Sequence, residues 1–363
     1  MNPVLLLLSV LACTQACYWN RQCPFPLHST KTPYDTVRGD IRDFTTPQNC
    51  EAVSVWTLNR HGNRNPGSSV TESIKYIASL KDEIDVNNFR RWSWNDTLEV
   101  SQSYLTGTGY EELFDIATRI REKYPHLLQG TAEDYYFRPT NEQRTITSAI
   151  AFAHGLNDGT NLTLHIDNAR TRDDVVRPYE NCDRYQQEVK TSQLLDDQMN
   201  DYFNTAEFIA VQHAVQQRLG LSTQLTPDNI YELYEICRFD RSWSDIHQSP
   251  WCAAFSDHDL VVLEYRDDIR HYYRNGYGSW VNVNLGGPAL KDLYENFEAA
   301  VQGHGRKVTS YFTHDTMLEM VWCALGIFKD PNQLQASFRN PGRVWRTSSI
   351  GAFSVNLIAV LNR

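Results

Sequence analysis

One apolar run in this chain ends abruptly in a cluster of charged residues. Glu51 to Leu58, EAVSVWTL, is rich in β-branched and aromatic residues and contains neither glycine nor proline. The sequence RHGNRNP follows from Arg60 to Pro66, and its glycine and proline end the strand pattern. We therefore predict that this loop lies at the carboxyl end of a strand, the edge at which α/β sheets bind ligands.

The residue types in this loop suit a phosphate ester. Loop and helix-start N–H groups attract anions, and the guanidinium groups of Arg60 and Arg64 match phosphate oxygens. Binding alone needs no histidine, but a neutral imidazole at His61 could attack phosphorus and carry the phosphoryl group. The arginines would stabilise the equatorial oxygens and lower the pKa of the imidazole. The alternative is a solvated basic turn in which His61 only fills a gap.

Helix and strand patterns alternate near both ends of the chain. Before residue 165 we predict a helix within 108–128, a strand from Tyr135 and a helix at about 142–156. After residue 285 we predict a helix, a strand, a helix and a final strand, at 286–302, 307–314, 315–328 and 351–361. Residues from about 165 to 285 are mostly helical in pattern. This indicates an α/β domain formed by residues 17–164 and 286–363, with a helical insertion or cap at 165–285.

Size and charge limit the possible functions. The chain has 363 residues, more than one compact core usually organises, which agrees with a domain carrying an insertion. Its formal charge of −10 argues against nucleic acid or an acidic membrane surface as a partner. An anionic substrate would have to be met by local cations. No acidic or histidine cluster has the spacing of metal ligands, so we expect neither a metal nor a cofactor.

The first residues predict a secretory route. An apolar run from Pro3 to Ala12, followed by small residues to Ala16, is typical of a cleaved signal peptide at 1–16, although a buried helix is the alternative. No later segment is apolar enough to cross a membrane, so we expect a secreted protein with no integral membrane segment after cleavage. Sequons at Asn95 and Asn161 predict glycosylation.

The eight cysteines do not follow metal-site spacing, and disulfides suit a secretory compartment. Cys237 and Cys252 bracket a short loop, and we predict that they pair. The remaining cysteines after cleavage at Ala16 are odd in number, namely Cys17, Cys23, Cys50, Cys182 and Cys323. A free thiol, a cut beyond Cys17 or a partner missing from this chain would each explain the odd count.

RHGNRNP matches every fixed position of the RHGxRxP signature, so the chain resembles the histidine acid phosphatases, branch 2 of the histidine phosphatase superfamily. RPTNEQRTITSAIAF, residues 138–152, looks like the family's second segment, and it puts Arg144 at the third phosphate-binding arginine. Within the family, four segments are most similar to multiple inositol polyphosphate phosphatases: KTPY, YEICRFDRSW, SPWCAAFS and DLVVLEYRDDIRHYYRNGYG. The resemblance implies a central mixed sheet flanked by helices.

THDTM, residues 313–317, looks like the family's His-Asp motif. A second pair, His258-Asp259, lies in the helical insertion, but only His314-Asp315 ends a strand and opens a helix as the RHG loop does. Asp315 would protonate the leaving oxygen, and its pKa would rise beside a bound phosphate. His314 would donate a hydrogen bond to that phosphate. The alternatives are a plain helix N-cap for Asp315 and a core imidazole for His314.

The resemblance implies a phosphomonoesterase with a phosphohistidine intermediate. His61 would attack, Asp315 would protonate the leaving group and then activate water, and Arg60, Arg64, Arg144 and His314 would hold the phosphate. The implied substrate is an inositol polyphosphate such as phytate. Its charge needs more cations, and Lys31 is a candidate, with an exposed lysine as the alternative. Two other hypotheses are a broad-specificity acid phosphatase and a binder of inositol phosphates that has lost turnover.

The chain departs from this subfamily in two ways. Multiple inositol polyphosphate phosphatases usually carry His-Ala-Glu where this chain has His314-Asp315, which puts the order of phosphate removal in doubt. Chains of this family also run on past the strand that corresponds to GAFSVNLIAVL, whereas this one stops at Arg363. A C-terminal hairpin and a cysteine partner could therefore be absent.

Overall fold

The computed structural model describes residues 27–84, 92–160, 162–243 and 249–363. Its centre is a four-stranded sheet with the order β2-β3-β1-β4. The strands are β1 (Ala52–Arg60), β2 (Tyr135–Pro139), β3 (Val308–Thr313) and β4 (Asn356–Asn362). β1 and β2 each pair in parallel with β3, and β4 pairs antiparallel with β1. The predicted α/β fold with a mixed central sheet is confirmed.

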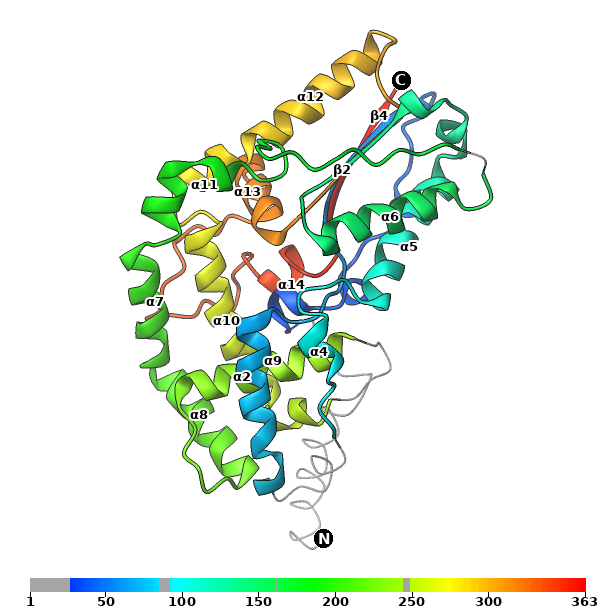
Figure 1. Ribbon diagram of the computed structural model, residues 1–363. Helices are drawn as coiled ribbons and strands as arrows, with labels where there is room; N and C mark the ends of the chain where they lie inside the picture. The colour runs from blue at the N-terminus through cyan, green and yellow to red at the C-terminus, as the bar shows by residue number, and fades with distance from the viewer. Residues whose placement is uncertain (1–26, 85–91, 161, 244–248) are drawn as a thin grey trace, which may run out of the picture.

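Helices cover both faces of this sheet (Figure 1). α5 (Gly107–Lys123) and α6 (Gln143–Asn157) pack on one face, around Val55, Phe137 and Phe312. α12 (Gly287–Val301) and α13 (Asp315–Leu325) pack on the other face, where Trp56, Leu58 and Tyr311 lie. Val55 and Trp56 contribute to opposite cores because successive strand side chains point to opposite faces.

A second, mostly helical region lies below the sheet in Figure 1. Its long helices are α7 (Gln193–Phe203), α8 (Ala206–Leu219), α9 (Pro227–Ser242) and α10 (Asp257–Arg274). The short α11 (Trp280–Leu285) follows them in the sequence and packs against α13. The described part of residues 165–285 contains no strand element, in agreement with its helical pattern. α2 (Ser68–Ser79) also packs against α9, although it precedes this range. The division at residues 164 and 286 stays a prediction.

Short elements complete the described chain. The short α-helices are α4 (Thr97–Val100) and α14 (Thr347–Ile350). The short 3₁₀ helices are η1 (Ser29–Lys31), η2 (Tyr34–Thr36), η3 (Ile41–Asp43), η4 (Leu80–Glu83), η5 (Pro125–Leu128), η6 (Ala132–Asp134), η7 (Pro178–Asn181) and η9 (Pro250–Ala254), and η8 (Tyr185–Val189) is a π-helix. η1 bears on the site, because it carries Lys31.

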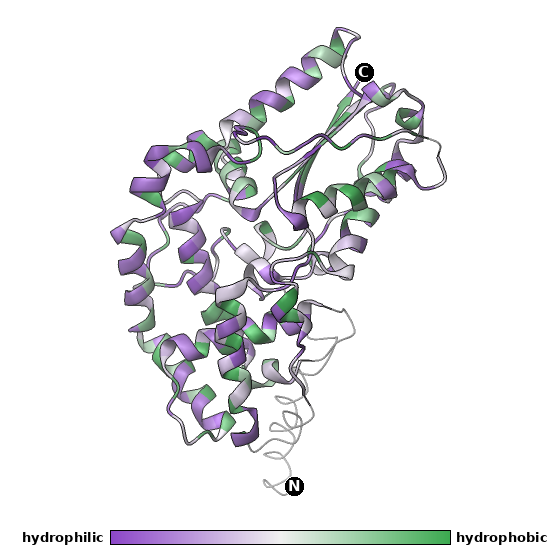
Figure 2. Cartoon of the chain, in the orientation of Figure 1, coloured by the Kyte–Doolittle hydropathy of each residue, from purple (hydrophilic) through white to green (hydrophobic). Residues whose placement is uncertain are grey.

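α10 is hydrophilic in Figure 2 yet largely buried. Ion pairs explain this combination. Glu264 and Asp268 of α10 both bind Arg343, and Asp267 binds Arg238 of α9. A buried charge is tolerated only when it is paired and hydrogen-bonded, so these contacts connect α10 to α9 and to the segment before α14.

Candidate active site

Strand pairing brings the two predicted motifs together. Arg60 is the last residue of β1 and lies opposite Thr313, the last residue of β3. The N–H of His61 donates to the carbonyl oxygen of Thr313 over 2.9 Å. The imidazole rings of His61 and His314 are therefore neighbours, with centroids 5.5 Å apart. Backbone register thus joins residues about 250 positions apart at one sheet edge, as the sequence predicted.

The hydrogen bonding of His61 leaves one ring nitrogen free to react. Nδ1 lies 2.8 Å from the carbonyl oxygen of Gly62. A carbonyl can only accept, so Nδ1 carries the proton and Nε2 carries the lone pair. Burial lowers the pKa of His61 well below its ordinary value, and the charges of Arg60 and Arg144 lower it further. His61 is therefore a buried, neutral imidazole, as a nucleophile requires.

Arg60 is fully buried beside His61. Its Nη1 donates to the carbonyl oxygens of Thr30 and Gly351, and its guanidinium lies over the ring of Phe353 with 4.8 Å to the centroid. Its Nη2 lies 3.1 Å from Oδ2 of Asp315. These contacts fix the guanidinium rigidly, with one side toward the candidate acid.

Asp315 is the first residue of α13, and His314 is its N-cap. The alternative in which Asp315 is only the N-cap of this helix is therefore wrong, because His314 occupies the N-cap position. Burial alone would raise the pKa of Asp315, but Arg60 and other cations outweigh burial and lower it below the ordinary value. Without a phosphate the carboxyl is ionised, so it needs a change in its surroundings before it can act as an acid.

His314 and Arg144 both face the carboxylate of Glu142, just before α6. Arg144 forms an ion pair with Glu142, whose Oε2 lies 3.6 Å from Nε2 of His314. Nε2 of His314 also lies 3.2 Å from the hydroxyl oxygen of Thr140, and burial with the charge of Arg144 lowers the pKa of His314 to about 3. Both predicted phosphate ligands thus lie beside the motif of β1. Glu142 was not predicted from the sequence.

Arg64 and Lys31 both lie close to the ring of Phe239, a residue of α9. The guanidinium of Arg64 is 5.7 Å, and the ammonium of Lys31 5.6 Å, from the centre of this ring. Burial and the charge of Arg144 lower the pKa of Arg64 to about 10. Lys31 is mostly buried, so the exposed alternative is wrong. Burial and the charge of Arg238 lower the pKa of Lys31 to about 7, although Glu235 raises it.

The first turn of α5 packs directly against the RHG loop. A β-carbon added at Gly62 would lie 2.2 Å from the carbonyl oxygen of Gly109, and one at Gly109 would lie 2.1 Å from that of Asn63. Both glycines therefore permit close backbone approach. Glu112 of the same helix accepts a hydrogen bond from the N–H of Asn63. The sequence predicted the helix, but nothing in its periodicity indicated this contact.

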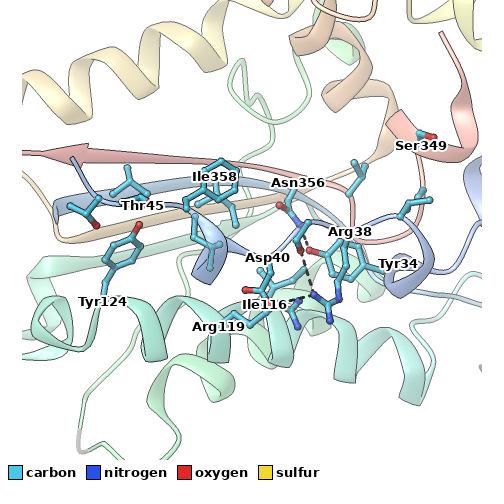
Figure 3. Close-up of a pocket in the computed structure, with 18 of the residues that line it drawn as sticks. Tyr34, Arg38, Asp40, Thr45, Ile116, Arg119, Tyr124, Ser349, Asn356 and Ile358 are labelled. Atoms are coloured by element: carbon cyan, nitrogen blue, oxygen red, sulfur yellow. Dashed lines mark hydrogen bonds and ion pairs between the residues drawn. The ribbon is translucent and has the colours of Figure 1, made fainter. Parts of the chain in front are cut away.

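A cavity of about 560 Å³ lies apart from these motifs (Figure 3). It is bounded by Tyr34, by residues 37–41, by α5 and by β4. None of the six predicted catalytic and phosphate-binding residues lines it. Since β4 and α5 line it and the two motifs do not, cavity size alone does not identify the site.

The other predicted sites have mixed outcomes. Cys237 and Cys252 form the predicted disulfide. Asn95 is exposed, and Asn161 and the predicted signal at 1–16 lie outside the described residues, so glycosylation and cleavage stay predictions. In the described part of the chain, no group of three His, Cys, Asp or Glu side chains could hold a metal ion. No helix there is long and apolar enough to span a bilayer.

Comparison with known proteins defines the family. Residues 53–358 match the model of the histidine phosphatase superfamily, branch 2, so the chain belongs to that family. It is 30% identical over 398 residues to multiple inositol polyphosphate phosphatase 1 of Drosophila melanogaster, covering 98% of this chain and 81% of the relative. An acid phosphatase of Schizosaccharomyces pombe is 27% identical, covering 92% and 76%. This chain is therefore a phosphoric monoester hydrolase whose substrate is a small-molecule phosphate ester.

Solved structures agree on the fold. The phytase from D. castellii superposes with a TM-score of 0.78 at 18% identity, covering 93% of this chain and 76% of that one. A multiple inositol polyphosphate phosphatase from Bifidobacterium longum, in complex with inositol hexasulfate, gives a TM-score of 0.71 at 14% identity, covering 93% and 88%. At these identities the likeness concerns the fold alone.

Proposed function

We propose that this protein is a secreted enzyme that hydrolyses inositol polyphosphates through a phosphohistidine on His61. The observation that carries the proposal is the neutral His61, whose Nδ1 proton is held by Gly62 and whose Nε2 is left as the nucleophile. Arg60 and His314 lie around the same ring, so a bound phosphoryl group would meet donors as it meets the nucleophile.

The reaction takes two steps. The lone pair of Nε2 forms a bond to phosphorus, the ester P–O bond breaks, and the carboxylic acid of Asp315 gives its proton to the departing alkoxide. Water then attacks the phosphohistidine, the N–P bond breaks, and the Asp315 carboxylate takes the proton of the water. The products are an alcohol and inorganic phosphate, and both side chains return to their starting states.

The charges around Asp315 explain how it could become an acid. Arg60 lowers the pKa of this carboxyl in the ligand-free site. A phosphate dianion bound beside Arg60 and Asp315 would offset the charge of Arg60 and add a negative charge, and both changes would raise the pKa of Asp315. Asp315 would therefore be protonated, and able to act as an acid, only when substrate is bound.

The substrate class rests on the relatives and on the cations beyond the reacting phosphate. The Drosophila relative is named a multiple inositol polyphosphate phosphatase, and the Bifidobacterium protein of that name was solved with inositol hexasulfate. Lys31, which lies with Arg64 close to the ring of Phe239, could meet a further phosphate of the same inositol ring. Secretion is supported only by the signal pattern at 1–16 and by the two sequons.

The test measures phosphate release from phytate and from p-nitrophenyl phosphate by wild type and His61→Ala. We expect the variant to lose at least about 10³-fold in kcat on both esters, because no other group would attack phosphorus. Residual turnover within tenfold of wild type would rule out His61 as the nucleophile. A phosphate-trapped protein whose label is stable to alkali and labile to acid would identify phosphohistidine.

Two alternatives are distinguished by the same assay. A broad acid phosphatase would hydrolyse p-nitrophenyl phosphate as efficiently as phytate. The acid phosphatase from Schizosaccharomyces pombe among the relatives favours that reading. A binder without turnover would release phosphate from neither ester and still bind phytate in calorimetry.

A further inference from the structure

Glu112 connects both backbone segments that hold the nucleophile. Its Oε2 accepts from the N–H of Asn63 over 2.8 Å and from the hydroxyl of Ser354 over 2.7 Å. Asn63 lies two residues after His61. The N–H of Ser354, in turn, donates to the carbonyl oxygen of His61 over 3.2 Å. One carboxylate oxygen therefore links Asn63, in the loop after His61, to Ser354, whose N–H bonds to the carbonyl oxygen of His61.

Burying the Glu112 carboxyl is energetically unfavourable, which argues that its hydrogen bonds have a role. Glu112 is only 6% exposed, and burial raises its pKa to about 7, although its hydrogen bonds with Ser354 and Asn63 lower it. A carboxylate near a phosphate site also opposes an anionic substrate. Within the described chain, Arg60 and Asp35 are charged groups that interact with it. Among the residues that the structure describes, no ion pair involves Glu112, and its Oε2 accepts two hydrogen bonds.

Other contacts also hold the loop here: the hydroxyl of Ser148 accepts from the N–H of Gly62, and the side-chain amide of Asn63 donates to the carbonyl oxygen of Ser242. Gly62 and Gly109 let α5 and the loop touch through backbone atoms, and Thr106 adds hydrogen bonds to the carbonyl oxygen of Asn63. These contacts set the distance between α5 and the loop. The Glu112 oxygen adds a second link between the loop and Ser354, beside the direct hydrogen bond from the N–H of Ser354 to the carbonyl oxygen of His61.

We propose that Glu112 is a positioning residue that fixes His61 in line with the phosphorus atom by joining Asn63 to Ser354. The inference rests on the proposed function, since an in-line attack by His61 is what the positioning serves. It does not touch substrate. Its loss should therefore lower kcat and leave KM nearly unchanged, because misplacing a reacting group by about 1 Å can cost on the order of 10²-fold.

Three variants test the acceptor oxygen itself. Glu112→Met keeps the length and removes both acceptors, and we expect kcat on phytate to fall at least about tenfold with KM within twofold. Glu112→Asp keeps the carboxyl group but is one methylene shorter, so it should also lose about tenfold. Glu112→Gln keeps one acceptor oxygen for Asn63 and Ser354, and kcat should stay within about threefold. At pH 5, where a group with a pKa of about 7 is uncharged, Gln is the nearest mimic.

The neighbouring Glu111 supplies a matched control. It lies on the same turn of α5 and is exposed. Glu111→Met and Glu111→Gln should leave kcat and KM within twofold of wild type. Circular dichroism and thermal melting of all variants identify any that fail to fold. If Glu112→Met does not fold, Glu112→Asp carries the comparison.

Hydrogen exchange gives a readout that does not depend on turnover. Amides of residues 61–65 should exchange faster in Glu112→Met than in Glu111→Met, because the Asn63 N–H loses its acceptor. Unchanged exchange there, or a kcat for Glu112→Met within twofold of wild type, would overturn the inference. A Gln variant as slow as the Met variant would also overturn it. If wild type hydrolyses neither ester, the proposed function fails, and exchange alone decides whether Glu112 holds the loop.

Discussion

The two sides of the candidate site are built in different ways. The phosphate side, defined by Arg60, His61, His314 and Asp315, is fixed by parallel pairing of β1 with β3. The Lys31 side, defined by Lys31, Arg64 and Phe239, is assembled from side chains of η1, the RHG loop and α9. Backbone register tolerates few alternatives, whereas side-chain packing between helices can change by substitution. The phosphate side therefore suits the reaction step, which stays the same for every substrate. The Lys31 side suits the choice among substrates, which can vary.

The substitution Asp315→Asn tests the phosphate side of the site and has the largest expected effect. An amide cannot protonate the leaving alkoxide, so we expect kcat on phytate to fall about 10²–10⁴-fold. The loss on p-nitrophenyl phosphate should be smaller, because nitrophenolate leaves without a proton. Steady-state kinetics on both esters measure the two ratios. Equal losses on both esters would mean that Asp315 acts on phosphate binding and not on the leaving group.

The second His-Asp pair supplies the control for that variant. Asp259 caps the start of α10 by accepting from the N–H of Ser256, and it pairs with Arg218. It lies outside the phosphate side defined above. Asp259→Asn keeps a capping side chain, so its kinetics should match wild type within twofold while its melting temperature falls slightly.

Lys31→Met tests the other side of the site with a smaller expected effect. Removing one cation should raise KM for phytate about tenfold and leave kcat and the kinetics on p-nitrophenyl phosphate nearly unchanged. The pKa of Lys31, about 7, adds a pH test. The ammonium is charged below that pH and neutral above it, so the KM advantage of wild type over the variant should shrink as the pH rises through 7.

The exposed Lys291 of α12 is the matched control for that experiment. Lys291→Met removes the same charge from the chain far from Phe239 and should leave KM for phytate unchanged at every pH. A drop in kcat in Lys31→Met with KM constant would contradict the division of the site into two sides, because it would place Lys31 in the chemical step.

The predictability of each part follows from the same division. Hydrophobic runs bounded by glycine and proline located β1, β3 and the helices after them, and parallel strands necessarily end at one sheet edge. His61, His314 and Asp315 could therefore be placed together from sequence. The burial of Lys31, the Glu142 carboxylate beside Arg144, and the Glu112 contact depend on three-dimensional packing between distant segments. Residue periodicity carries no signal for such contacts.

The smallest expected effect on activity comes from the disulfide. Cys237 of α9 and Cys252 of η9 close a loop with a sequence separation of 15, and such a cross-link contributes about 3 kcal/mol by restricting the unfolded chain. For a chain of this size that corresponds to a fall of ~4 °C in melting temperature. The double variant Cys237→Ser with Cys252→Ser should therefore melt earlier and keep its kcat, with the exposed Cys50→Ser as control. A selective rise in KM for phytate would instead show that this link also fixes Phe239, two residues after Cys237, on the Lys31 side.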